Sequence, residues 1–199
     1  MPSRTGRRVI TLLAAAVLSL AIAPVADAAR PPDKGAKAKP HCASRLVRLG
    51  PGKQRVKVTS TRCFTDLASA VRFAQPGSAI PDQVTAPQIR TILQAAAMKS
   101  TPSATTIIGI HWEHAGRGGR DRIYYVKGAA PCAGGRVWQI NKLDAGWDTL
   151  ASSAEAFGGC GTFSQFSAVN WKGQSRVCTP YCASLGGLND HVKSVRWRS

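Results

Sequence analysis

The chain has 199 residues, of which 44% are apolar and 19% charged, so it can bury one or two small cores and is too apolar to be disordered throughout. Lysine and arginine outnumber aspartate and glutamate by 27 to 10, which gives a formal net charge of +17. This composition excludes collagen-like, coiled-coil and multi-pass membrane proteins. The place of the positive charge along the chain must be found before the charge is interpreted.

Residues 1–28 have the organisation of a signal peptide. Arginines precede an apolar run over 9–23, and an Ala-x-Ala cleavage site ends at Ala28. The run is shorter than the roughly 20 residues that cross a bilayer. We therefore expect residues 29–199 to be secreted, through the general route or, because of the Arg7-Arg8 pair, through the twin-arginine route.

Export places the cysteines in an oxidising compartment, where an even number predicts disulfides. The six are Cys42, Cys63, Cys132, Cys160, Cys178 and Cys182. Several connectivities are possible. The spacing favours a Cys42–Cys63 bridge, a small Cys178–Cys182 ring and, from the two that remain, Cys132–Cys160. A metal site is disfavoured because there are no matching CxxC pairs.

Positive charge is concentrated at the start of the secreted chain, where residues 30–62 carry ten bases and one acid. Residues 29–41 are rich in proline, lysine and alanine, so we expect a flexible basic leader that cannot bury a core. The ten bases predict affinity for an anionic cell-wall polymer, an anionic lipid surface or extracellular DNA. A solvated charge run that aids solubility explains them equally well.

A hairpin is predicted next, because alternating segments around 46–49 and 55–59 flank Gly50-Pro51-Gly52. If the numbers of opposite residues add to about 105, a single register accounts for all the pairs. That register sets Leu49 opposite Val56, Val47 opposite Val58 and Cys42 opposite Cys63. The expected bridge would close the basic hairpin, which is marginal in water on its own.

Two short helices are predicted after the hairpin. Thr65 can cap the first, and Pro76-Gly77 ends it. Thr85 and Gln88 form a capping box for the second. The buried positions follow helical spacing; they are Leu67, Ala70, Val71 and Ala74 in the first helix and Ile89, Ile92, Leu93 and Ala96 in the second. Residues 42–104 are thus expected to form a small α+β region, with 100–103 as a linker.

From Thr105 onward the chain is rich in glycine, aromatic and β-branched residues, which predicts short strands at all-β spacing. One pattern occurs twice in this half: an aromatic residue, four residues, a second aromatic position, one residue and a glycine. Residues 166–173 read FSAVNWKG and residues 112–119 read WEHAGRGG, with Arg117 at the second aromatic position. Each copy of the pattern is followed by an acid or amide and a serine, in DTLASS at 148–153 and NDHVKS at 189–194.

These repeated motifs resemble the βγ-crystallin Greek-key motif, and specifically the secreted actinobacterial family of the Streptomyces metalloproteinase inhibitor. The resemblance covers residues 105–199 and is closest in CASLGGLNDHVKSVRW at the end of the chain. It implies a mainly β, βγ-crystallin-like double Greek-key sandwich in which paired aromatics pack a folded corner and a glycine takes a strained backbone conformation. Arg117 departs from the pattern, so the first corner is expected to be looser or closed by the arginine stem on Trp112.

Calcium-binding members of the family carry N/D-N/D-x-x-S/T-S, which supplies oxygen ligands. The corresponding candidates here are Asp148, Leu150, Ser152, Asn189 and His191. Lys193 replaces a hydroxyl residue in the second copy, and its ammonium would repel the ion or take its place. The alternative is that these polar residues fix turns through local hydrogen bonds. We therefore expect no cofactor other than a weakly bound calcium ion.

No catalytic motif emerges. His111 and His114 would project to opposite faces of a strand and cannot share a metal. Glu113 could form an acid/base pair with Asp121 or Asp144, but no spacing favours that pair. We predict a protein that is not an enzyme.

The leading functional hypothesis rests on the small ring and on the family resemblance. A bridged ring would hold Thr179, Pro180 and Tyr181 as a rigid loop, with Tyr181 at an exposed tip. The family implies a disulfide-closed inhibitory loop, although its sequence differs and the ring here is shorter. We expect a monomeric inhibitor of a secreted peptidase, with binding to an anionic cell-wall polymer as the alternative. The basic segment lacks stacking aromatics, so sequence-specific nucleic-acid recognition is not expected.

Overall fold

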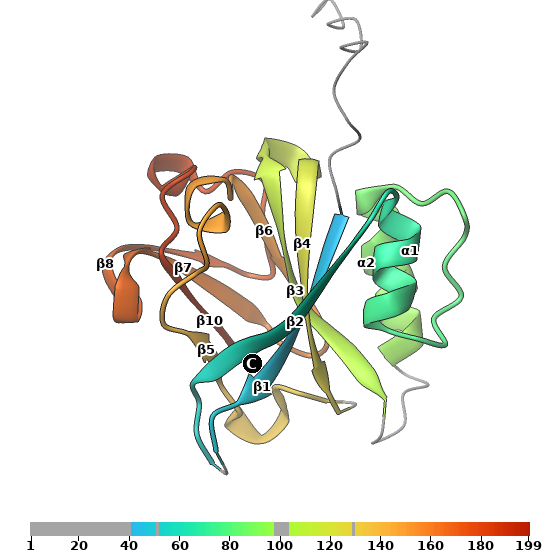
Figure 1. Cartoon of the computed structure of the whole chain (residues 1–199), viewed down its shortest axis with the longest axis horizontal. Coiled ribbons are helices and arrows are strands. Elements are labelled where there is room, and N and C mark those ends of the chain that lie inside the picture. Colours follow the sequence, from blue (N-terminus) through green and yellow to red (C-terminus); the bar gives the residue numbers. More distant parts are fainter. Residues whose placement is uncertain (1–40, 51, 98–103, 129) are drawn as a thin grey trace, which may run out of the picture. The chain divides into compact units, whose positions relative to one another are not determined.

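The computed structural model describes residues 41–50, 52–97, 104–128 and 130–199 (Figure 1). The predicted signal peptide, nearly all of the leader and the linker 100–103 lie outside these residues. Neither of the helices described is both long and apolar enough to cross a bilayer.

The described strands form two sheets. The six-stranded sheet has the order β2-β1-β4-β3-β6-β9, and its strands are β1 (His41–Arg48), β2 (Val56–Phe64), β3 (Thr105–His114), β4 (Gly118–Lys127), β6 (Ser153–Ala156) and β9 (Tyr181–Cys182). The four-stranded sheet has the order β5-β10-β7-β8, and its strands are β5 (Trp138–Ile140), β10 (Ser194–Arg198), β7 (Thr162–Ala168) and β8 (Lys172–Cys178). The mainly β fold class predicted from the sequence is confirmed.

The two copies of the repeat exchange a strand. In the first copy β3, β4 and β6 lie in the six-stranded sheet while β5 lies in the other sheet. In the second copy β7, β8 and β10 lie in the four-stranded sheet while β9 pairs with β6 of the first copy. The orders β4-β3-β6-β9 and β8-β7-β10-β5 are therefore equivalent. Each sheet is completed by the third strand of the other copy.

The two folded corners match residue for residue. Trp112 pairs with Asp121 and His114 with Gly118, while Phe166 pairs with Ser175 and Ala168 with Lys172, and both hairpins have an irregularity at the same place. All four positions in the first corner lie 54 residues before their equivalents. The corners are the short helices η1 (Ala115–Arg117) and η4 (Val169–Trp171).

A serine closes each corner in the same way. Ser153 Oγ donates to His114 O at 2.7 Å and accepts from Arg117 N at 3.2 Å. Ser194 Oγ donates to Ala168 O at 2.7 Å and accepts from Trp171 N at 2.9 Å. The hydroxyl thus satisfies one donor and one acceptor that the bend leaves without a strand partner. The repeat predicted from the sequence is therefore also present in the serine hydrogen bonds that close the two corners.

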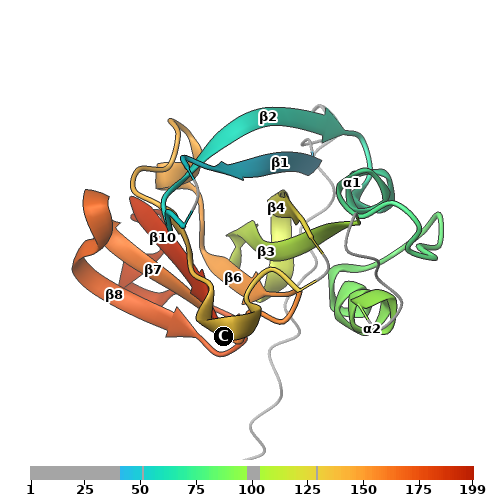
Figure 2. The same ribbon diagram turned by 90° about the horizontal axis from the view of Figure 1, so that it is seen from below.

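Two cores lie on opposite faces of the six-stranded sheet. One fills the space between the sheets and includes Tyr124, Phe163 and Trp197. The other lies between the six-stranded sheet and the helices α1 (Leu67–Ala74) and α2 (Ala86–Ala97), and includes Ile89 and Trp112. Figure 2 shows both helices on one side of β3 and β4, with β7, β8 and β10 on the other side.

The β1–β2 hairpin extends the six-stranded sheet, because β1 runs parallel to β4 over His41–Arg45. Cys42 lies opposite Cys63 as predicted, and the two form a disulfide. The predicted pairs Leu49–Val56 and Val47–Val58 are wrong. A bulge after Arg45 shifts the register by one, so that Leu46 lies opposite Val58 and Arg48 opposite Val56. This shift turns Leu46 and Val56 into the core.

Both predicted helices are present, with one correction. Asp66, and not Thr65, caps α1, because its carboxylate accepts from Ser69 N at 2.7 Å. Before α2, Thr85 N donates to Gln88 Oε1 at 2.8 Å, which is one half of the predicted capping box. Pro76-Gly77 follows the end of α1, as expected.

Candidate functional site

The small ring is closed and tied to the sheet. Cys178 and Cys182 are bridged, as are Cys132 and Cys160. Pro180 O accepts from Ala156 N at 2.8 Å, and β9 pairs with β6 directly after the ring. Thr179 is exposed and Pro180 is half-buried. The loop is therefore held on both sides and presents mainly one side chain to solvent.

Tyr181 is not at an exposed tip, contrary to the prediction from the sequence. Its ring is half-buried and lies edge-on to Trp112, with 6.5 Å between the ring centroids. The guanidinium of Arg117 lies 3.6 Å from the centroid of the Tyr181 ring. The strand pairing of β9 turns this side chain towards the helical layer, where cation–π contact holds it.

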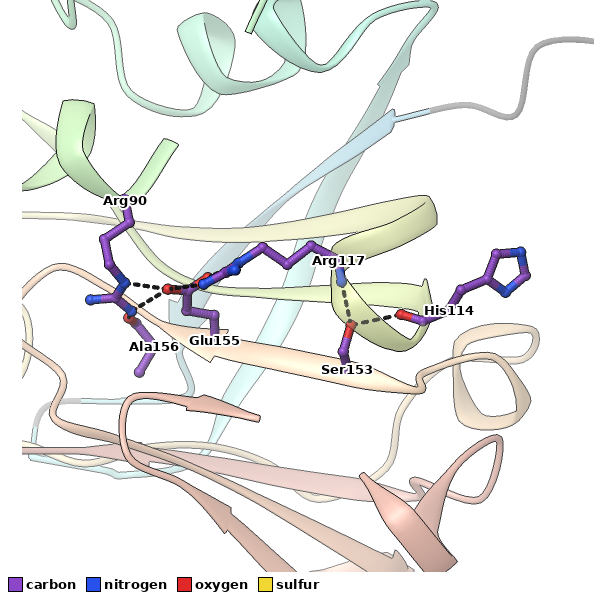
Figure 3. A network of polar contacts seen from close by, with 6 residues as sticks. All are labelled: Arg90, His114, Arg117, Ser153, Glu155 and Ala156. Atoms are coloured by element: carbon purple, nitrogen blue, oxygen red, sulfur yellow. Dashed lines mark hydrogen bonds and ion pairs between the residues drawn. The ribbon is translucent and has the colours of Figure 1, made fainter. Parts of the chain in front are cut away.

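Arg117 closes the first corner by charge. It donates to Glu155 from Nε at 2.7 Å and from Nη2 at 3.1 Å, while its guanidinium lies 5.9 Å from the Trp112 ring. The carboxylate of Glu155 is fully buried and also pairs with Arg90 from α2 (Figure 3). Hydrogen bonding to Glu155 raises the pKa of Arg117. The arginine closes the corner, as one of the two expectations had it, but through its guanidinium on Glu155 and Tyr181 and not through its stem on Trp112.

The calcium candidates separate into two places. At one, Lys193 Nζ donates to Asp148 O at 3.2 Å and to Asp148 Oδ2 at 3.0 Å. The hydrogen bond from Lys193 lowers the pKa of Asp148. An ammonium therefore occupies this position, and the residues there do not fit calcium.

At the other place Ser152 Oγ donates to Asp190 Oδ1 at 3.0 Å. Asn189 instead contacts Ser184 Oγ at 3.4 Å, and its carbonyl is 2.6 Å from His191 Nδ1. The oxygens of Ser152 and Asp190 are a partial ligand set; Asp190 fits the motif in the sequence but was not among the predicted ligands. Its place directly after Asn189 in the motif was the available signal. Among the described residues no three His, Cys, Asp or Glu side chains form a metal-binding group.

The acids that were considered for catalysis are separated. Glu113 pairs with Arg120 at 3.1 Å, Asp144 pairs with Arg122, and Asp121 pairs with His41. Burial raises the pKa of Asp121, and the hydrogen bond to Asp121 raises that of His41.

His111 is a core residue. Its Nδ1 lies 3.1 Å from Tyr124 Oη and its Nε2 lies 2.8 Å from Gln165 Oε1. Burial lowers the pKa of His111 to about 4. The side chain of His114 is exposed and points away from Glu155 (Figure 3).

The β1–β2 hairpin carries the densest positive charge among the described residues. No acid occurs between His41 and Phe64. Its six bases are Arg45, Arg48, Lys53, Arg55, Lys57 and Arg62. All except Arg48 are exposed, and no ion pair joins any of the six to a carboxylate in the described ranges. Six of the eight acids in the described residues pair with other cations, and Asp66 and Asp190 accept hydrogen bonds from Ser69 and Ser152. None of these carboxylates therefore neutralises the hairpin.

The loop end of the hairpin adjoins the second sheet. Gln139 N donates to Gln54 O at 3.0 Å, and the Arg48 guanidinium lies 4.1 Å from the centroid of the Trp138 ring. Burial, together with the nearby charge of Arg136, lowers the pKa of Arg48. The positive charge therefore extends from the hairpin towards β5.

Comparison with known proteins gives little beyond this geometry. No protein-family model matches the chain, and no curated protein matches it. Among solved structures it is similar to a βγ-crystallin from an archaeon, with 16% identity and a TM-score of 0.33 over 46% of this chain and 96% of that chain. The strand order and the corner contacts define the fold.

Proposed function

We propose that the protein binds an anionic polymer of the cell envelope through the β1–β2 hairpin. The observation that supports this is a hairpin with six bases, no acid and no ion pair to a carboxylate in the described residues. β2 is the edge strand of its sheet, so its outer backbone edge faces solvent, and most of its side chains are exposed. Phosphates or carboxylates spaced along a polymer would replace the counterions of these bases.

The disulfide preorganises this surface. Cys42–Cys63 joins the two strands at the end opposite the turn, so the bases are held on a ribbon of fixed geometry. Fewer degrees of freedom are lost when such a ribbon binds than when a flexible basic tail binds. The basic leader would add charge next to the same surface, which strengthens the attraction without fixing its geometry.

The test is to measure the binding of charge-matched variants to poly(glycerol phosphate). The hairpin variant replaces Lys53, Arg55 and Lys57 by Gln, and the control variant replaces Lys127, Lys172 and Arg198 by Gln. We expect wild-type affinity to fall about a hundredfold between 50 and 200 mM salt. The hairpin variant should bind much more weakly and the control should bind nearly as the wild type. Equal loss in both variants would show that net charge alone is responsible and would refute the hairpin assignment.

We propose peptidase inhibition through the ring as a second function. In its favour, the ring is closed by Cys178–Cys182 and anchored by the Ala156–Pro180 hydrogen bond, and its first residue after Cys178, Thr179, is exposed. A rigid loop that can enter a peptidase cleft loses little entropy on docking. Thr179 would make the contact, because Tyr181 is engaged by Arg117.

Inhibition of a thermolysin-type metalloproteinase by the purified secreted form tests this proposal. Thr179→Asp should weaken inhibition strongly, while Thr179→Ser, the matched control, should retain it. Inhibition that survives Thr179→Asp would place the contact elsewhere. No inhibition by the wild type would reject this function for that class of peptidase and would leave the polymer proposal unaffected.

A further inference from the structure

The outer faces of the two sheets are equivalent in position, and the charged residue at the centre of one has the opposite sign to that at the centre of the other. One row of outward residues crosses each sheet at the same level. In the six-stranded sheet the row is Ile123, Ile110, Glu155 and Tyr181, and in the four-stranded sheet it is Val177, Ser164, Arg196 and Gln139. Arg196 therefore takes the place of Glu155, the acid at the centre of the first network.

The first row is covered throughout, whereas the second is covered only in part: Ser164 and Gln139 are buried there, and Val177 is exposed. Both helices cover the first row, since Arg90 of α2 pairs with Glu155 and α1 packs against β4, where Ile123 lies. Ile123 is 0% exposed there, whereas its equivalent Val177 is 46% exposed. In Figures 1 and 2 neither helix lies over β7, β8 and β10. The four-stranded sheet thus exposes an aliphatic side chain where its counterpart contributes to a core.

Arg196 has aromatic neighbours and lacks an acid. Its guanidinium lies 5.5 Å from the Phe166 ring centroid and 5.6 Å from that of Trp171. Its Nε is buried without a hydrogen-bond partner, and among the described residues no carboxylate pairs with it. A buried donor without an acceptor costs free energy that a bound anion would recover.

The whole four-stranded sheet is free of acid. Its strands contain Lys172, Arg176, Arg196 and Arg198, and no Asp or Glu. The first copy satisfies its central acid with a base from a covering helix. The second copy has a central base and lacks a covering element in the described residues, so the complementary element would carry an acid.

We propose that the outer face of the four-stranded sheet binds an acidic amphipathic segment of another protein. A carboxylate of that segment would reach Arg196 from the place that Arg90 takes over Glu155. An apolar side chain of the same segment would cover Val177, as the apolar layer under the helices covers Ile123 in the first copy. This partner is distinct from the envelope polymer, and its surface is distinct from the hairpin.

The chain itself does not supply such a segment. Both of its helices lack acids. Residues 29–40, which lie outside the described structure, carry four bases and one acid. The acids of a second copy are largely engaged in internal ion pairs. A hydrophilic polymer would satisfy Arg196 and would leave Val177 and the 41%-exposed Val169 in water. These observations favour a different protein.

The probe is a synthetic peptide with the sequence of residues 85–97 and the substitution Arg90→Glu, blocked at both ends. Isolated helices of this length are marginal, so binding should be weak and is followed by NMR at low salt. We expect shifts of the Trp171 indole and Arg196 Nε signals on titration to about 2 mM peptide. The peptide with Arg90 unchanged should bind at least about fivefold more weakly.

Three protein variants complete the test. Arg196→Gln and, separately, Val177→Ser should each weaken binding about fivefold or more, while the charge-matched control Lys127→Gln should not. Val177→Ser alters an exposed edge position, so it keeps the test valid if Arg196→Gln impairs folding. Absence of shifts, equal binding of the two peptides, or equal loss in Lys127→Gln would overturn the proposal. Tighter, Arg196-dependent binding of poly(glycerol phosphate) than of the peptide would assign this face to the polymer and also overturn it.

Discussion

Acidification should destabilise the protein through one buried imidazole. His111 is 0% exposed, and burial lowers its pKa from 6.5 to about 4. A hydrogen bond from Nε2 to Gln165 opposes this shift and the charge of Arg122 adds to it. In the neutral form Nε2–H donates to Gln165 Oε1 and Nδ1 accepts from the Tyr124 hydroxyl, so both ring nitrogens are satisfied without a proton on Nδ1.

The sign and size follow from linkage. Between pH 6.5 and 4 the unfolded chain binds a proton at His111 and the folded chain does not, so the free energy of unfolding falls as the pH falls. The contribution is complete above pH 6.5. About 2 kcal/mol is lost by pH 5 and about 3 kcal/mol by pH 4. This is a large share of the 5–15 kcal/mol that stabilises a typical domain.

The assay is urea unfolding at pH 7 and pH 5 of the wild type and His111→Gln. Other titrating groups, including His41, whose pKa is raised, largely cancel in the difference between the two proteins. The variant should be less stable at pH 7, and its deficit should shrink by about 2 kcal/mol at pH 5. The exposed control His191→Gln should match the wild type at pH 7. A deficit that is independent of pH, or an NMR titration of His111 near pH 6.5, would refute the reasoning.

Three further outcomes are expected. Glu155→Gln leaves the half-buried guanidinium groups of Arg90 and Arg117 without their buried carboxylate and should cost about 3 kcal/mol or more in urea unfolding; a loss below about 1 kcal/mol would contradict the network. A Cβ at Gly109 would overlap the Trp197 indole, so Gly109→Ala should lower the free energy of unfolding by about 1–3 kcal/mol, and an unchanged melting temperature would show that the sheets separate easily. Lys193→Ala removes the hydrogen bond that lowers the pKa of Asp148, so NMR titration should show that pKa move up towards its usual range; no movement would mean that the ammonium does not hold this site.

Local signals predicted the parts of the structure that depend on local chemistry. The spacing from Trp112 to Gly119 and from Phe166 to Gly173 encodes two corners whose glycines have φ of +77° and +78°, a conformation that few other residues adopt. The three disulfides follow the predicted pairing. Both helices are where the apolar spacing placed them.

Contacts between distant segments could not be predicted in this way. The parallel pairing of β1 with β4 joins residues about 80 positions apart, and nothing in either strand specifies its neighbour. The bulge after Arg45 depends on which face meets the core, so the hairpin register was wrong beyond the disulfide.

The candidate site was affected in the same way. Tyr181 was expected at an exposed tip because the ring was considered alone, whereas its direction is set by β9 pairing with β6. The meeting of Ser152 with Asp190 likewise joins the two copies. Sequence spacing identified the chemistry of these segments, and the exchange of strands decided which of them meet.

The exchange of β5 and β9 has a consequence for the descent of this half of the chain. A precursor with a single copy of the repeat would have lacked the third strand of its own sheet, so it would have needed a twin molecule to lend one. Duplication within one gene would then have converted an obligatory pair of molecules into a single polypeptide. Severing the chain between Gly161 and Thr162, which keeps the Cys132–Cys160 disulfide within one fragment, should leave two fragments that fold only in each other's presence, as complementing halves.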